Sequence, residues 1–415
     1  MLDPVFSSGP SVEALAAGLR QRMNREGREL SDEEVMQLCE DAVLSDPSCL
    51  RAGFARKAEL AGLIFATLRC ELEILQQFAD DPEVTEIMVN GCDGIFIERG
   101  RESFKADFNF ESSARLEQVI RRLAARVGRE INDLNPIVDA RLSDGSRVNA
   151  VHSNIAIGGP VLTIRKFTLS RLTMDELVEK GDISSEAAAL LCLLVECGYN
   201  IFVCGGTSSG KTTFLNVLSD YIPPRERVIV IEDSAELKIR NHENLVRLEA
   251  KSANAQGKGA VSIRDLIRSS LRMRPDRIIV GEVRGAEVID MLATMSTGHD
   301  GSLSTGHANS PRGMLGRLET MALSGGEYPV DAIRKQIAEA IEIIVHLSRS
   351  HDGRRRVMRI CELTGYREGD FELNELFAMD VESGRLERTG VLKNTDKIAM
   401  RGRMDGLREL YPEQR

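Results

Sequence analysis

The chain of 415 residues contains the stretch Gly205-Gly206-Thr207-Ser208-Ser209-Gly210-Lys211-Thr212, which matches the pattern G-x-x-x-x-G-K-[ST]. The apolar run IFVC (201–204) precedes it, and the helical pattern TTFLNVL (212–218) follows it. A buried strand, a glycine-rich turn and a helix in this order are the context that a phosphate-binding P-loop requires. The stretch therefore predicts a nucleotide site in an α/β domain, and a glycine-rich turn without a ligand is the alternative.

Each residue type in this stretch suits the binding of phosphate. Glycines allow successive backbone N–H groups to turn inward around phosphate oxygens, and the start of the following helix adds the positive end of its dipole. The Lys211 ammonium would neutralise charge on the β- and γ-phosphates, and the Thr212 hydroxyl would coordinate Mg²⁺. The sequence thus predicts that ATP and Mg²⁺ bind at the residues from Gly205 to Thr213.

Acidic residues follow two predicted strands after the P-loop. The strand RIIVG (277–281) runs directly into Glu282, which is the Walker B position with Glu in place of the more common Asp. A second cluster, EDSAE (232–236), follows the apolar run RVIVI (227–231). Carboxylates beside a triphosphate can hold the shell of Mg²⁺ and polarise the attacking water. For Glu232 and Asp233, helix capping or a surface ion pair is the alternative role.

Two of the six histidines stand in a repeated Thr-Gly-His frame, at His299 and His307. They flank the strand-like run 301–305, and the frame favours a phosphate-facing role for both. A metal site is the competing idea, but no third ligand with suitable spacing is present. A loop histidine without a ligand is the simplest alternative.

The rest of the chain divides into segments that differ in their predicted secondary structure. Strand and helix patterns alternate from residue 184 onward, which is typical of βαβ units and a largely parallel sheet. Short strands with turn signals such as Asn90-Gly91 and Asp144-Gly145 precede this region. The predicted parts are a helical N-terminal extension (1–75), a small α+β N-terminal domain (76–172), a polar linker (173–183), the P-loop domain (184–350) and a β-rich, charged C-terminal extension (351–415).

Composition limits the possible partners. The net charge of −10 gives the whole molecule no attraction for nucleic acid or an anionic membrane. The longest apolar run (187–195) is well short of the roughly 18 residues that a membrane-spanning helix needs. The N-terminal segment has no basic-then-apolar signal pattern, so we expect a cytosolic protein.

Four motifs stand in one order: GGTSSGKTT (205–213), VIEDSAEL (230–237), RPDRIIVGEVRGAE (274–287) and TGHDGSLSTGHANS (297–310). Together they resemble the Walker A, Asp box, Walker B and His box of the secretion-ATPase superfamily of type II and type IV secretion and pilus systems. The segments EIMVNG (86–91), PIVDARLSDGSRVNAV (136–151) and GGPVLTIRKF (158–167) are most similar to its Tad (Flp) pilus assembly branch, the CpaF family. The resemblance covers about residues 75–350.

The resemblance implies a hexameric ring in which each subunit has an N-terminal domain and a RecA-like motor domain. ATP would bind between the two domains and the adjoining subunit. The ring would lie in the cytoplasm, against an inner-membrane platform, and drive pilin extraction or protein export. It also implies site roles, which fall on Lys211 and Thr212 (Walker A), Glu236 (catalytic glutamate), Glu282 (Walker B, acting through metal-bound water), His299 and His307 (His box), and Arg147 and Arg165, with Arg141 beside them (cations from the N-terminal domain).

Two other functions fit parts of the sequence. A nucleic-acid translocase can also be a RecA-like ring, but it should carry basic pore loops. The only tight basic run here is Arg354-Arg355-Arg356, for which a solvated surface run is favoured over a lipid contact, so no nucleic-acid partner is expected. A non-hydrolysing nucleotide-binding scaffold would lack the catalytic carboxylates, which the chain retains at Glu236 and Glu282.

Overall fold

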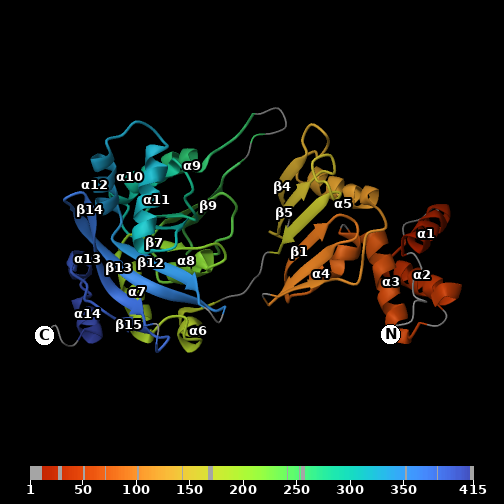
Figure 1. Cartoon of the computed structure of the whole chain (residues 1–415), viewed down its shortest axis with the longest axis horizontal. Helices are drawn as coiled ribbons and strands as arrows, with labels where there is room; N and C mark the ends of the chain where they lie inside the picture. Colours follow the sequence, from red (N-terminus) through yellow and green to blue (C-terminus); the bar gives the residue numbers. More distant parts are fainter. Residues whose placement is uncertain are drawn as a thin grey trace. The chain divides into compact units, whose positions relative to one another are not determined.

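The computed structural model describes residues 12–26, 30–49, 52–70, 72–100, 102–142, 144–166, 172–240, 242–251, 253, 258–350, 353–380 and 382–411. The chain divides into two compact units, Met1–Leu169 and Ser170–Arg415. Figure 1 shows the helices and strands of each unit.

The first unit begins with three packed helices. The α2 helix starts at a capping box, in which Ser31 accepts from the N–H of Glu34 and the Glu34 carboxylate accepts from the N–H of Ser31. Buried Ala16, Val35 and Ile64, one from each helix, join them in one apolar cluster. The helices of this region are α1 (Val12–Glu26), α2 (Asp32–Ser45), the short 3-10 helix Pro47–Cys49 and α3 (Phe54–Arg69).

The remainder of the first unit is an antiparallel sheet of six strands in the order β3-β2-β1-β6-β5-β4. The amphipathic helix α5 packs on this sheet through Leu116, Val119 and Leu123, which are buried with sheet residues such as Ile87 and Leu162. The elements are the 3-10 helix Glu73–Leu75, α4 (Gln76–Asp80), β1 (Val84–Asn90), β2 (Ile95–Arg99), β3 (Glu102–Lys105), α5 (Ser113–Arg126), β4 (Ile137–Arg141), β5 (Arg147–Val151) and β6 (Val161–Arg165).

The second unit is built on a sheet of nine strands in the order β15-β14-β13-β12-β7-β11-β10-β8-β9. The strands from β12 to β9 run parallel, and β13, β14 and β15 are added antiparallel. The strands are β7 (Ile201–Gly205), β8 (Val228–Glu232), β9 (Leu245–Glu249), β10 (Arg277–Val280), β11 (Leu303–His307), β12 (Ile343–Arg349), β13 (Arg355–Arg367), β14 (Asp370–Met379) and β15 (Leu386–Arg388).

Helices cover both faces of this sheet (Figure 1). They are α6 (Met174–Glu179), α7 (Ser185–Cys197), α8 (Lys211–Ser219), α9 (Ile263–Ser270), α10 (Glu287–Met295), α11 (Pro311–Leu323), α12 (Val330–Ala340), α13 (Asp396–Met400) and α14 (Met404–Leu410). Alternate residues of each central strand enter opposite cores: Ile201 and Val203 pack with α7 and α8, while Phe202 packs with α10 and α11. The predicted α/β class with a largely parallel sheet is confirmed.

Two segments differ from the sequence-based expectation. The polar linker expected at 173–183 contains helix α6, because Thr173 and Glu176 form a capping box and Met174 and Leu177 are buried. Residues 351–415, expected as a β-rich, charged extension, supply β13 to β15 to the sheet of the P-loop domain and Ile398 and Leu407 to its core. Strand pairing to β12 is a long-range contact, which the local pattern does not reveal.

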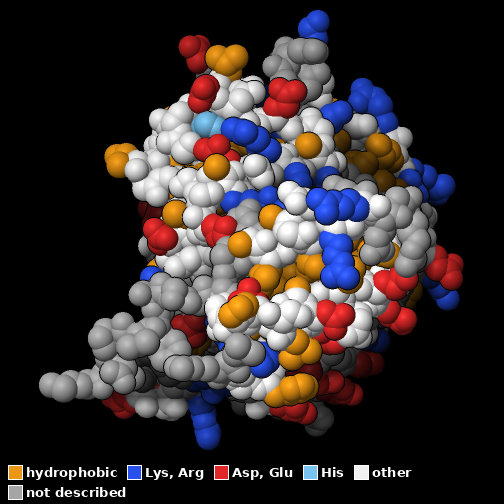
Figure 2. Space-filling model, turned by 90° about the vertical axis from the view of Figure 1, so that its right-hand side faces the viewer, with side chains coloured by type: hydrophobic (Ala, Val, Ile, Leu, Met, Phe, Trp, Pro, Cys, Tyr) orange, Lys and Arg blue, Asp and Glu red, His pale blue; other side chains and the backbone are white. Residues whose placement is uncertain are grey.

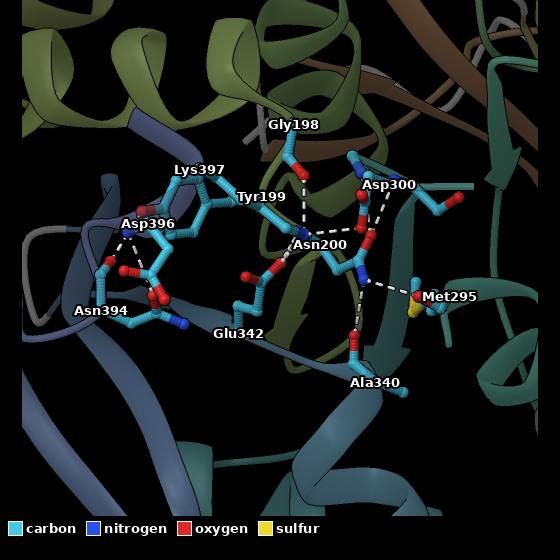
Figure 3. A network of polar contacts seen from close by, with 12 residues as sticks. Gly198, Tyr199, Asn200, Met295, Asp300, Ala340, Glu342, Asn394, Asp396 and Lys397 are labelled. Carbon is cyan, nitrogen blue, oxygen red and sulfur yellow. Dashed lines mark hydrogen bonds and ion pairs between the residues drawn. The ribbon is translucent and has the colours of Figure 1, made fainter. Parts of the chain in front are cut away.

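A buried polar network fastens the amino-terminal edge of the parallel strands (Figure 3). The Asn200 side chain donates to the carbonyl oxygens of Met295 (3.1 Å) and Ala340 (2.8 Å), and its Oδ1 accepts from the N–H groups of Gly301 (2.9 Å) and Ser302 (3.0 Å). This one amide therefore joins the ends of α10 and α12 to the start of β11, just ahead of β7.

Helix α13 is tied to the same edge by Lys397. Its Nζ lies 2.6 Å from Glu342 Oε2 and 2.8 Å from Asp300 Oδ1, and it donates to the Gly198 carbonyl at 3.0 Å. Burial raises the pKa of Glu342, and the Lys397 charge opposes that rise. Helix α13 is thus held by an ion pair that lies partly inside the domain.

Replacing Asn200 by alanine should lower the free energy of unfolding by about 2 to 4 kcal/mol, because two N–H groups and two carbonyls would lose their partner in a buried place. Denaturant unfolding of the full chain measures this loss. Asn244, which is exposed and contacts Arg227, is the matched control, and its alanine variant should change stability by well under about 1 kcal/mol. Equal stability of the two variants would contradict the role given to Asn200.

Candidate nucleotide-binding site

The P-loop joins the end of β7 to the start of α8. Gly205 is the last residue of β7, and Lys211, Thr212 and Thr213 open the helix. A side chain at Gly205 would place its Cβ only 2.4 Å from the Leu347 carbonyl oxygen and from Ser209 Oγ, so only glycine fits. Gly210, with φ +94°, takes the left-handed conformation that ends the loop. The turn that the sequence predicted is therefore formed between β7 and α8.

Lys211 contacts both its own loop and the His307 side chain. Its Nζ donates to the Gly206 carbonyl at 3.0 Å and lies 3.2 Å from His307 Nδ1. Burial lowers the pKa of Lys211, while the nearby Glu282 charge opposes this shift. The ammonium thus contacts a carbonyl oxygen and an imidazole nitrogen, both of which a phosphate group could replace.

His307, the last residue of β11, joins Lys211 to the Walker B glutamate. Its Nε2 lies 2.7 Å from Glu282 Oε1, and its Nδ1 faces the lysine ammonium. Burial lowers the pKa of His307, although the Glu282 charge acts in the other direction. A neutral imidazole with its proton on Nε2 satisfies both contacts, because Nδ1 can then accept from lysine.

Arg284 completes this row of contacts and was not selected in the sequence analysis. It donates to Glu282 Oε2 at 2.8 Å and lies 3.9 Å from Asp233 of the second acidic cluster. The bond to Glu282 raises the pKa of Arg284. Arg284 stands two residues after Glu282 in the segment 274–287. The sequence therefore shows that the arginine is close to Glu282 along the chain, but not that the two side chains are paired. Walker A, His box, Walker B and Asp box residues are thereby joined in one row of contacts.

The two glutamates of the second acidic cluster have different surroundings. Glu232, at the end of β8, is buried and its Oε1 accepts from the N–H groups of Glu236 (2.8 Å) and Leu237 (2.9 Å). Burial raises the pKa of Glu232, and these two N–H groups counteract the rise. Glu236 is half-buried, and its charge acts on Lys211 and Arg284. Glu232 therefore holds the loop, while Glu236 lies near the P-loop cation.

Gly281 lies between the two acidic motifs. A Cβ at this position would come to 2.9 Å from Glu232 Cγ, on the neighbouring strand. The buried Glu232 side chain thus occupies the space beside Gly281 and leaves no room there for a larger residue.

The structure does not bring His299 to the P-loop. Strand β11 runs parallel to β7 with His307 paired to Gly205, so His299 precedes the opposite, amino-terminal end of β11. The strand residues from Leu303 to Gly306, at about 3.3 Å each, lie between the two histidines. The loop after His299 is held by Asn200, as described above. Of the two histidines, His307 is therefore the one that lies beside Lys211 in the chain described here, and a phosphate-facing role for His299 stays a prediction.

The predicted cations of the N-terminal domain lie in the first unit and form a row across its sheet. Arg141 of β4 pairs with Arg147 of β5, and Arg147 pairs with Arg165 of β6. Like charges directly opposite one another on paired strands are unfavourable unless an anion or acidic group lies near. Glu86 of β1 pairs with Arg165 on its other side. Burial raises the pKa of Glu86, and the Arg165 charge opposes the shift.

None of the helices in the described segments is long and apolar enough to cross a membrane.

Comparison with known proteins identifies the family. The family model described as type II/IV secretion system protein matches residues 70–405. A putative conjugal transfer protein of Mycobacterium tuberculosis (strain H37Rv) is 37% identical over 296 residues, which cover 70% of this chain and 84% of that protein. The type IV secretion system protein VirB11 of Brucella suis is 31% identical over 337 residues, covering 74% of this chain and 92% of VirB11.

A solved structure shows the same fold. The Legionella pneumophila ATPase DotB aligns with a TM-score of 0.51 at 20% identity, covering 71% of this chain and 81% of DotB. At 20% identity, the similarity to DotB supports a common fold and nothing further. The extent of the family match and of the two relatives is decisive: the chain belongs to the type II/IV secretion system protein family.

Proposed function

We propose that the protein is a Mg²⁺-dependent ATPase that couples ATP hydrolysis to pilus assembly or protein secretion across the inner membrane. The observation that carries this proposal is the row of contacts from Lys211 through His307 and Glu282 to Arg284. It joins the phosphate-binding lysine to a carboxylate that can support hydrolysis. A binding scaffold would need the loop but not the carboxylates.

The residues at the P-loop suit a triphosphate with its metal ion. The loop N–H groups from Gly206 to Lys211 and the Lys211 ammonium would bind the β- and γ-phosphates. Thr212 and, through water, Glu282 would hold Mg²⁺, which supplies charge neutralisation at the phosphate oxygens when bound. Because Lys211 is held only by a carbonyl and an imidazole, its ammonium can turn to the phosphate without leaving a carboxylate unpaired.

Glu236 is the residue we assign to the attacking water. Both oxygens of Glu282 already face cations or donors, His307 on one side and Arg284 on the other. Glu232 is buried and uses its Oε1 to hold the loop. Glu236 is the half-buried carboxylate whose charge acts on Lys211, and a carboxylate that orients water accepts its proton in the transition state.

Cations from the N-terminal domain would complete the site. The row of Arg141, Arg147 and Arg165 concentrates positive charge on three neighbouring strands. We propose that Arg147 and Arg165 contact phosphate oxygens, in the same subunit or in a neighbour, and stabilise the charge that develops during hydrolysis. Release of phosphate would loosen this contact and let the two domains move.

The finer assignment follows the sequence motifs. The segments at 86–91, 136–151 and 158–167 favour the Tad (Flp) pilus branch, the CpaF family, with a hexameric ring in the cytoplasm acting on inner-membrane platform proteins and, through them, on pilin or secreted protein. The relatives named for conjugal transfer and type IV secretion support the wider class. On the face shown in Figure 2, Lys and Arg side chains occur together with Asp and Glu and with separate hydrophobic patches, and such a mixed surface does not favour a nucleic-acid translocase.

The purified full chain should release phosphate from ATP in the presence of Mg²⁺ and stop when the metal is chelated by EDTA. Light scattering on the same sample should show an assembly of six chains of 45.8 kDa each, favoured by ATP. A chain that neither binds ATP nor releases phosphate would contradict the ATPase proposal. A monomer at every nucleotide concentration would contradict the ring.

A further inference from the structure

A pocket of about 240 Å³ lies beside the P-loop, on the side of β12. It is lined by Gly206, Thr207, Ser209, Asn309, His346, Ser348 and Arg349. Strand β12 runs parallel to β7, and its Leu347 pairs with Gly205. Ser348 and Arg349 therefore continue past the strand pairing at the level where the P-loop begins. This side of the loop is opposite β11, which carries the Lys211 contact to His307.

The lining of this pocket is suited to an anion. It contains three hydroxyl groups, one amide and one guanidinium, and no carboxylate. The hydroxyl of Ser209 is buried, and it has no hydrogen-bond partner among the described residues. Burial and the charge of Arg359 lower the pKa of His346, so its imidazole is neutral near pH 7. A buried hydroxyl without a partner implies a ligand atom that completes its bonding.

The β12–β13 hairpin brings further positive charge to the same place. Arg349 lies directly opposite Arg355 across the two strands, and such like-charge pairs are unfavourable. Arg355 packs against the P-loop, because a methyl group on Gly210 would come to 3.3 Å from its Cδ. No carboxylate of the described segments lies within ion-pair distance of Arg349. The hairpin thus places two opposed arginines beside the loop that binds phosphate.

The run Arg354-Arg355-Arg356 is consequently not a simple solvated surface run. Arg354 lies 3.5 Å from Asp182 and donates to the Lys180 carbonyl, which fixes the hairpin to the segment before α7. Because Arg354 is fixed and the next residue, Arg355, pairs with Arg349, the end of β12 is also held near the P-loop.

We propose that Arg349, together with Ser348 and Asn309, binds phosphate oxygens of the nucleotide, as a cation that the P-loop domain supplies to its own site. The inference rests on the proposed ATPase function and adds a phosphate-binding residue to it. The planar guanidinium can engage two phosphate oxygens at once, and the bound phosphate offsets the repulsion between Arg349 and Arg355.

The test compares Arg349→Gln, Arg349→Lys and the control Arg367→Gln in the full chain. Arg367 lies at the far end of β13, the strand that pairs with β12, where it is exposed and lies 3.4 Å from Glu372. Binding is measured by calorimetry with two probes, Mg²⁺ with ATP and Mg²⁺ with inorganic tripolyphosphate. We expect Arg349→Gln to weaken both probes by about tenfold or more, Arg349→Lys to weaken them less, and Arg367→Gln to leave both unchanged.

Two results would overturn the inference. One is unchanged affinity of Arg349→Gln for both probes, and the other is a loss for ATP with none for tripolyphosphate, which would place the nucleoside in the pocket. Thermal unfolding without added nucleotide distinguishes a role in binding from a role in stability. Because the substitution removes one of two like charges that face each other, the unfolding midpoint of Arg349→Gln should equal or exceed that of the unsubstituted chain. Failure of the unsubstituted chain to bind either probe would contradict the proposed function itself.

Discussion

Replacing Lys211 by alanine should abolish ATP binding and reduce phosphate release by a factor of about 10³ or more. The lysine is the cation at the P-loop helix start, and its Nζ lies between the Gly206 carbonyl and His307. Alanine would remove the charge that neutralises the β- and γ-phosphates and leave only the loop N–H groups to bind them. Phosphate release and equilibrium binding of ATP, both with Mg²⁺, measure the two effects.

The matched control for this change is Lys335→Ala. Lys335 is an exposed lysine of α12, so its loss changes the net charge equally without touching the loop. The control should bind and hydrolyse ATP as the unsubstituted chain does. Near-normal turnover by Lys211→Ala would show that the P-loop takes no part in the reaction, and would contradict the proposed function.

Glu236→Gln should bind ATP with little change and hydrolyse it about 10² to 10⁴ times more slowly. Glutamine keeps the size of the side chain but cannot accept the proton of the attacking water. Single-turnover kinetics with a separate binding measurement distinguish this outcome from a loss of affinity.

Glu232→Gln provides the contrast for Glu236. The Glu232 Oε1 accepts two N–H groups, and a glutamine oxygen can accept the same two bonds. Burial also raises the pKa of Glu232, which favours a neutral side chain at this place, although the Arg247 charge acts in the other direction. We expect turnover close to that of the unsubstituted chain. If Glu232→Gln stops hydrolysis while Glu236→Gln does not, the general base has been assigned to the wrong residue.

The sequence predicted those parts of the site that are contiguous in the chain. The P-loop from Gly205 to Lys211 needs only a strand, a turn and a helix in succession, and all three have local signals. Glu282 was predicted at the end of its strand for the same reason, since a short run of buried apolar residues ends directly before it.

The two histidines show what a repeated motif leaves open. His299 and His307 stand in the same Thr-Gly-His frame, but the strand between them places them at opposite edges of the sheet. Similar residues in a repeated motif do not show at which end of a strand each one lies. The length of the strand between them gives this information, because a five-residue strand is longer than a phosphate site is wide.

Contacts between distant strands could not be predicted at all. Arg349 and Arg355 oppose one another only because β12 and β13 pair, and Arg349 reaches the P-loop only because β12 pairs with β7. In the sequence, these arginines belong to a charged hairpin far from residues 205–213. Likewise, the role of Glu232 depends on the N–H groups of a loop whose path has no strong local signal.

The contact between Gly281 and Glu232 has a practical consequence for protein engineering. The side chain of one strand fills the volume that the other strand leaves empty, so the two positions behave as a matched pair. A chimera that imports the Walker B segment from a relative with a larger residue at 281, while retaining the native β8, would force the glutamate off its loop. Exchanges of this P-loop domain between relatives should therefore carry both strand ends together.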